Sequence, residues 1–151
     1  MPFIAAVATR EGRPSCARFD RVSNFSSDAV ETWAKQALAP EDQTVSDGLQ
    51  AFRRLASQSA HERIVTGGGP NSVNIPAFRW VNTLLGNLKT ALSGTYHAFD
   101  FAKYGHRYLA EYQYRFNRRN DLRALLPRLL RAAALTPKRT QVWLRLPEDS
   151  C

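Results

Sequence analysis

Hydrophobic positions recur along this chain with two different periods, and the changes of period divide it into elements. A short apolar run over residues 3–9 leads to the turn-forming residues 11–14, and a second, loosely alternating run follows over 15–22. This pattern predicts an antiparallel β-hairpin. After it, Ser26 is a helix N-cap candidate, and apolar residues then recur at helical spacing until Pro40 ends the stretch.

Strand and helix patterns alternate through the middle of the chain. Residues 43–46 are a brief β-leaning run, and Asp47-Gly48 turns into a helical stretch. Residues 61–66 are predicted to form another strand, and a longer helix is predicted from about residue 78 to residue 92.

The last third is predicted to be helical. Apolar and aromatic residues repeat there at a spacing of three to four, namely Tyr104, Tyr108, Leu109, Tyr112 and Phe116. These rings are expected in a core, the alternative being a surface on which exposed bases stack. A further helical stretch is predicted over residues 122–135, with Pro127 as a kink or break, and residues 143–147 form a short apolar tail.

The element order predicts one mixed α/β domain of the α+β kind over residues 1–151. Residues 1–100 are expected to hold the sheet core and the long helix, and residues 101–151 a basic helical flank. A chain of 151 residues with 44% hydrophobic and 23% charged content is typical of globular proteins.

Targeting and redox signals are few. No apolar run approaches the roughly 20 residues that span a bilayer, and the N-terminus lacks the features of a signal peptide. Cys16 and Cys151 are far apart and fit no metal-ligand spacing. We therefore expect a cytoplasmic, reduced protein with no membrane partner.

Charge is distributed unevenly along the chain. Twenty-one Lys and Arg oppose thirteen Asp and Glu, which gives a net charge of +8, and residues 101–151 carry eleven basic and four acidic residues. Such a balance favours polyanionic partners such as DNA. The alternative is a basic surface that is merely solvated.

Asp47 is the first candidate for chemistry. It follows the predicted strand 43–46 and precedes Gly48, so it is expected at the carboxyl end of a strand, where open α/β sheets commonly bind ligands. The alternative is that Asp47-Gly48 is only a turn or a helix cap.

Asn82 and Lys89 are the second candidate pair. Seven residues correspond to about two helical turns, so both side chains are expected on one face of the predicted helix. The Asn amide oxygen can ligate a hard cation such as Mg²⁺, and the Lys ammonium can hold a phosphate. The alternative is an ordinary polar helix surface.

Three successive blocks place these candidates in a wider context. Residues 78–89, 94–97 and 108–119 read FRWVNTLLGNLK, GTYH and YLAEYQYRFNRR. In this order they resemble blocks of bacterial insertion-sequence transposases of the DDE superfamily, whose catalytic core is RNase H-like. Asn82, followed seven residues later by Lys89, resembles the subset of that family with Asn as the third catalytic residue.

The resemblance implies roles for individual residues. Asp47 and Asn82 would be catalytic metal ligands, and Lys89 would contact DNA near the cut. Two Mg²⁺ or Mn²⁺ ions would polarise the phosphate and activate water or a 3′-hydroxyl for strand cleavage and transfer. The partners would be transposon ends and target DNA, in association with the nucleoid. His97 would lie close to the site, and further DNA contacts are expected from Arg115, Arg118 and Arg119.

One departure from the family pattern limits the expected activity. The family's first catalytic Asp precedes the strand matched here by residues 3–9, and no acidic residue occurs before residue 9. Asp20 and Asp28 align with later elements and are not assigned to this role. The chain is therefore expected to be the C-terminal portion of a DDE transposase, with a partial RNase H-like core, weak or absent metal binding and no DNA cleavage when alone.

Loss of a central strand would expose sheet edges, which favours self-association or pairing with intact transposase. Three alternatives remain open at this stage. The chain could be a noncatalytic DNA-binding remnant, a translated fragment without a stable fold, or an unrelated nuclease.

Overall fold

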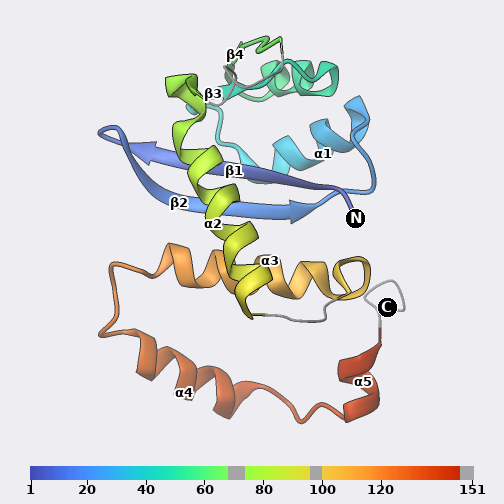
Figure 1. Ribbon diagram of the computed structural model, residues 1–151, viewed down its shortest axis with the longest axis vertical. Helices are drawn as coiled ribbons and strands as arrows, with labels where there is room; N and C mark the ends of the chain where they lie inside the picture. Colours follow the sequence, from blue (N-terminus) through green and yellow to red (C-terminus); the bar gives the residue numbers. More distant parts are fainter. Residues whose placement is uncertain (68–73, 96–99, 147–151) are drawn as a thin grey trace.

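The computed structural model describes residues 1–67, 74–95 and 100–146. It confirms a mixed α/β chain of the α+β kind (Figure 1). The elements in chain order are β1 (Phe3–Arg10), β2 (Arg13–Arg21), α1 (Ser27–Ala37), β3 (Gln43–Ser46), the 3₁₀ helix η1 (Gln50–Ser57), β4 (Ala60–Arg63), the short 3₁₀ helix η3 (Pro76–Phe78), α2 (Arg79–Thr95), α3 (Phe101–Asn117), α4 (Leu125–Leu135) and α5 (Gln141–Arg145).

The predicted hairpin is confirmed. Strands β1 and β2 pair antiparallel from Phe3↔Arg21 onward, with a register shift between Ala8 and Thr9. The connecting residues Glu11 and Gly12 have φ angles of 51° and 72°. Two consecutive left-handed residues match the twist of the flanking strands, which is why tight hairpin turns adopt this conformation.

Strands β3 and β4 form a separate parallel pair, from Gln43↔Ala60 to Ser46↔Arg63. The predicted strand 43–46 is confirmed, whereas the strand predicted over 61–66 ends at Arg63. The helix after Asp47 is a 3₁₀ helix and not the expected α-helix. Leu49, at its N-cap, provides no side-chain hydrogen bond to begin an α-helix.

Helices α1 and α3 lie on opposite sides of the hairpin (Figure 1), and a hydrophobic core lies on each side. The first joins the hairpin to α1 and η1 through the buried residues Ile4, Val22, Val30, Trp33, Ala34, Ala51 and Leu55. The second joins it to α2 and α3 through the buried residues Ala17, Phe19, Leu84, Leu88 and Leu109. Alternation along the strands produces this division, because successive side chains point to opposite faces.

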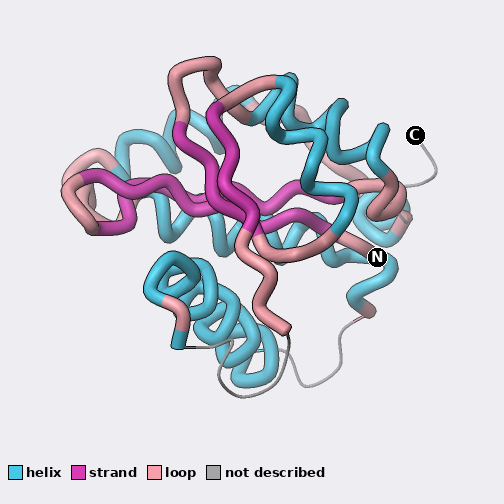
Figure 2. The backbone as a smooth tube through the Cα atoms, turned by 90° about the horizontal axis from the view of Figure 1, so that it is seen from above, coloured by secondary structure: helices cyan, strands magenta, loops and turns pink. Residues whose placement is uncertain are grey.

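Helices lie on several sides of the strands (Figure 2). Helix α1 begins where expected, since the Ser26 side chain accepts a hydrogen bond from the backbone N–H of Ala29. Helix α2 crosses the hairpin, and the Trp80 indole N–H at its start donates to the Gly12 carbonyl at 2.9 Å. The expected helices over residues 78–92 and 104–116 correspond to α2 and α3.

The last part of the chain is less buried. Helix α4 has no buried residue and begins at Leu125, later than the helical stretch predicted over 122–135, with Pro127 in its first turn, where proline is tolerated. The predicted apolar tail begins within the short helix α5. Among the described residues, no helix is both long and apolar enough to cross a membrane.

Candidate functional site

Asp47 lies at the carboxyl end of β3, as predicted, and its side chain is exposed. One of its carboxylate oxygens, Oδ1, accepts a hydrogen bond from the backbone N–H of Leu49 at 3.0 Å. This side-chain contact to the residue two positions on is an Asx turn. The turn that was the alternative explanation of Asp47 is therefore present, and it uses one of the two carboxylate oxygens.

A part-buried polar pair supports the strand end beneath Asp47. The Ser46 hydroxyl donates to the Asp47 carbonyl at 3.1 Å and lies 2.8 Å from Nε2 of His61 on β4. Which of the two atoms donates in the Ser46–His61 hydrogen bond depends on the tautomer of the imidazole. The two contacts of the Ser46 hydroxyl order the strand end.

Burial lowers the pKa of the His61 imidazole, and the positive charge of Arg63 lowers it further. The ring is therefore neutral at neutral pH.

Gly48 allows the turn after Asp47 to approach the segment that follows β4. A Cβ atom at Gly48 would lie 3.3 Å from the Cα atom of Val65, which is tighter than an ordinary contact. The carbonyl of Gly48 also accepts a hydrogen bond from the Arg63 guanidinium at 3.4 Å. These contacts fix the direction in which Asp47 projects.

Asn82 and Lys89 lie on α2, as predicted, with Asn82 half-buried and Lys89 exposed. Within the described residues, neither side chain makes a hydrogen bond or an ion pair with another side chain. Leu84 and Leu88 are buried and hold this helix against the hairpin. Lys89 borders an apolar groove of about 400 Å³, whose other lining residues are Phe3, Leu85, Leu88, Leu92 and Ser93.

The oxygen ligands around Asp47 and Asn82 are too few for a two-metal site. Two divalent cations about 3.5–4 Å apart need several anionic oxygen ligands. In the described ranges, no three or more His, Cys, Asp or Glu residues come together as a possible metal group. Asp47 would contribute one formal negative charge, and the neutral Asn82 amide none. The described residues therefore do not fit a pair of Mg²⁺ or Mn²⁺ ions.

The predicted DNA-binding arginines differ in their surroundings. Arg115 is exposed and forms an i,i+4 ion pair with Glu111. The Arg118 guanidinium lies 4.0 Å from the Tyr114 ring centroid, and its buried Nε has no hydrogen-bond partner.

Arg119 is held by its own chain. Its guanidinium lies 3.8 Å from the Phe116 ring centroid and donates to the carbonyls of Phe116, Pro14 and Ser15. These bonds join the end of α3 to the start of β2. His97, the residue expected to approach the site, lies outside the described residues.

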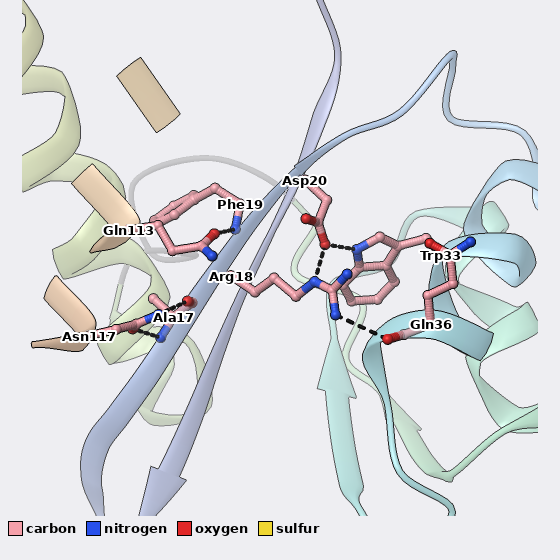
Figure 3. A network of polar contacts seen from close by, with 8 residues as sticks. All are labelled: Ala17, Arg18, Phe19, Asp20, Trp33, Gln36, Gln113 and Asn117. Atoms are coloured by element: carbon pink, nitrogen blue, oxygen red, sulfur yellow. Dashed lines mark hydrogen bonds and ion pairs between the residues drawn. The ribbon is translucent and has the colours of Figure 1, made fainter. Parts of the chain in front are cut away.

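Sequence reasoning missed a polar network on both sides of β2 (Figure 3). On one side, Gln113 and Asn117 of α3 bind the backbone of Phe19 and Ala17. The signal available in the sequence was a pair of amide side chains four residues apart on one helix face. Such pairs are common on helix surfaces, and nothing in the spacing indicates a bond to a strand.

On the other side of β2, Asp20 contacts α1. Its Oδ2 accepts hydrogen bonds from Arg18 and, at 2.7 Å, from the Trp33 indole N–H. Arg18 also donates to the Gln36 carbonyl at 3.0 Å (Figure 3). Asp20 borders an open polar groove of about 520 Å³, and its contacts give it a role in joining β2 to α1.

Comparison with known proteins gives one match. A family model described as ISXO2-like transposase domain matches residues 1–117, from the N-terminus to the end of α3. No curated protein and no solved structure matches the chain. Helices α4 and α5 lie outside the matched segment.

Proposed function

Because this chain belongs to the ISXO2-like transposase domain family, whose function is DNA transposition, we propose that its own part in that process is to hold DNA and not to cut it. The observation that carries this proposal is that no three or more His, Cys, Asp or Glu residues come together as a metal-binding group, around Asp47 or elsewhere in the described residues. The net charge of +8 supplies the attraction to DNA phosphates.

In this proposal, Asp47 and Asn82 hold the positions of metal ligands in a DDE-type site, and Lys89 lies against a DNA phosphate. The half-buried, unpartnered amide of Asn82 and the exposed ammonium of Lys89 support these roles. In a complete DDE-type site, Mg²⁺ or Mn²⁺ would polarise the phosphate that is cut. One carboxylate and one neutral amide bind such ions weakly, so we propose no cleavage step for this chain.

The proposal extends to an RNase H-like core that is completed by a further strand. Ala17 and Phe19 of β2 direct their backbone N–H groups toward α3. In an antiparallel pair, opposite residues direct their backbone groups either toward each other or both outward. The partners of Ala17 and Phe19, Val7 and Ala5 of β1, therefore present theirs on the outer edge of β1.

That edge makes no backbone hydrogen bond with another strand in the described part of the chain. The far edge of β2 is covered by α3, so the outer edge of β1 is the open side of this hairpin. Open edges recruit strands. We propose that a second copy of the chain, or an intact transposase, supplies a strand there.

Salt-dependent DNA binding tests the proposed function. Fluorescence anisotropy with a labelled duplex should show log affinity falling linearly with log salt, with a slope near −0.9 for each phosphate neutralised. Lys89→Gln should weaken binding and reduce the slope by about one. Lys35→Gln, which removes the same charge from α1 where Lys35 pairs with Glu31, is the matched control. Absence of binding, or binding that is insensitive to salt, would contradict the proposal.

A further inference from the structure

Cationic and aromatic side chains alternate where α5 lies against α3. The Trp143 ring has the guanidinium carbon of Arg139 4.2 Å from its centroid and that of Arg107 5.5 Å away. The Tyr104 ring has the same Arg107 carbon at 5.5 Å and the Lys103 Nζ at 5.0 Å. We call these five residues the α3–α5 cluster.

Backbone carbonyls hold the cluster together. Arg107 donates to the Leu144 carbonyl at 2.6 Å, and the Tyr104 hydroxyl donates to the Arg145 carbonyl at 3.4 Å. None of the cluster's three cations pairs with a carboxylate in the described parts of the chain. Their charge is therefore not neutralised by the neighbouring protein.

The arrangement leaves binding groups accessible. A guanidinium that stacks on a ring uses its flat face, so its N–H groups remain in plane and can bind a phosphate. Arg139 is exposed, and Trp143 is 37% exposed. The cluster thus offers phosphate donors and aromatic surface at the same place.

This combination distinguishes an unpaired strand from a duplex. In a duplex the flat faces of the bases are covered by their neighbours, and only phosphates and base edges are presented. In an unpaired strand the base faces are free to stack on aromatic rings, while cations follow the backbone. A basic surface without aromatic rings would bind duplex and unpaired strands alike, because it contacts only their phosphates.

We propose that the α3–α5 cluster binds an unpaired polynucleotide strand. Arg107 and Arg139 hold its phosphates, and a base stacks on the exposed Trp143 ring when the Arg139 guanidinium moves from the ring face to a phosphate. This inference rests on the proposed DNA-holding function and narrows it to one surface and one form of nucleic acid. The cluster includes α5, which lies outside the segment that the transposase family model matches.

Helix α4 provides the comparison that the test needs. Its Arg131 is exposed and stacks on no ring in the described structure, so Arg131→Gln removes one charge and no aromatic contact. Arg139→Gln removes the same charge from the cluster. The two variants therefore separate general electrostatic attraction from the role of the cluster.

The experiment compares three labelled probes of about a dozen nucleotides, a length within the site size of a single-strand platform. These are an oligothymidylate, an oligouridylate and a duplex of mixed sequence. Trp143→Ala should weaken binding of the single strands roughly 5- to 150-fold, the range expected for loss of one stacked base. Arg139→Gln should weaken it more than Arg131→Gln, whereas all three variants should bind the duplex within a few-fold of one another. Tighter binding of the oligothymidylate indicates that the bound strand is DNA, and tighter binding of the oligouridylate indicates that it is RNA.

A fluorescence measurement keeps the inference testable if Trp143→Ala detaches α5. Stacking on a base quenches indole fluorescence, so oligothymidylate should quench the wild-type protein, and Trp143→Phe, which keeps a ring on α5, should lose that quenching. Equal effects of Arg139→Gln and Arg131→Gln on single strands, or unchanged quenching in Trp143→Phe, would overturn the inference. Salt-dependent duplex binding with no preference for single strands would contradict the role of the α3–α5 cluster and leave the proposed DNA-holding function intact. Absence of binding to all three probes would contradict both.

Discussion

The side-chain amide of Asn117 forms both hydrogen bonds of a β-ladder rung with the backbone of Ala17. Its Oδ1 accepts from the Ala17 N–H at 2.7 Å, and its Nδ2 donates to the Ala17 carbonyl at 2.8 Å (Figure 3). Gln113, one turn earlier, accepts from the Phe19 N–H at 2.7 Å. Helix α3 thereby covers the edge of β2 as another strand would, and it leaves only the β1 edge of the hairpin open.

Replacing Asn117 by Ala should destabilise the protein by about 1–3 kcal/mol, because two part-buried backbone groups of Ala17 lose their partners. The change in free energy of unfolding is measured by urea titration. Asn87→Ala, which alters an exposed Asn on α2, is the control and should change the stability by less than about 0.5 kcal/mol. Equal stabilities of the two variants would show that the amide does not support the strand edge.

Leu109 tests whether the second core forms. Its side chain lies on α3, is 1% exposed and packs against residues of the hairpin and α2. Leu109→Ala should cost about 2–5 kcal/mol in the free energy of unfolding, from lost transfer energy and the cavity left behind. Leu130→Ala on α4, where the side chain is 63% exposed, should have little effect. A wild-type thermal melt without a cooperative transition would instead support a chain that has no stable fold.

Stability should fall on mild acidification because of His61. Burial and Arg63 lower the pKa of the folded imidazole, whereas the unfolded ring keeps the ordinary value near 6.5. Above the unfolded pKa both states are neutral and stability is complete. As the pH falls below it, the unfolded state takes up a proton that the folded state resists, so stability declines toward the folded pKa.

The measurement is urea unfolding of the wild type and of His61→Gln at pH 7.5 and pH 5.5. The wild type should lose more stability between these two values than the variant does. Parallel losses in both proteins would show that His61 does not contribute to the pH dependence.

The open edge of β1 predicts self-association that a proline can block. Ala5 directs its backbone N–H outward, so Ala5→Pro removes a donor from the free edge without removing a β1–β2 hydrogen bond. Analytical ultracentrifugation should show concentration-dependent association of the wild type that Ala5→Pro weakens. Ala6→Pro, whose N–H faces β2, should instead reduce the free energy of unfolding. A wild type that stays monomeric at all concentrations would contradict this use of the edge.

Elements with local signals were predicted well from the sequence. The hairpin followed from two apolar runs around turn residues, α1 from the Ser26 cap, and strand 43–46 from its β-leaning composition. The positions of Asp47 at a strand end and of Asn82 and Lys89 on one helix followed from the same local patterns. Each of these features is decided within a few residues of the chain.

Features that depend on distant partners were not predicted. The bond between Asn117 and Ala17 joins residues 100 positions apart, and no local pattern indicates it. The 3₁₀ geometry of η1 arises where a short segment must join two parallel strands. The stacking of Trp143 with Arg107 depends on how α5 lies against α3. The metal-binding and DNA-binding roles of Asp47, Asn82, Lys89 and the α3 arginines remain predictions.

The most direct test of the central claim measures binding and cleavage in the same samples. Supercoiled plasmid is incubated with the protein in Mg²⁺ or Mn²⁺, and bound and nicked DNA are separated on parallel native and denaturing gels. We predict salt-sensitive binding without nicked product, because no group of three or more His, Cys, Asp or Glu residues comes together in the described part of the chain to hold metal. Metal-dependent nicking that Asp47→Ala abolishes, with binding unchanged, would contradict the account and show that this chain carries a working catalytic site.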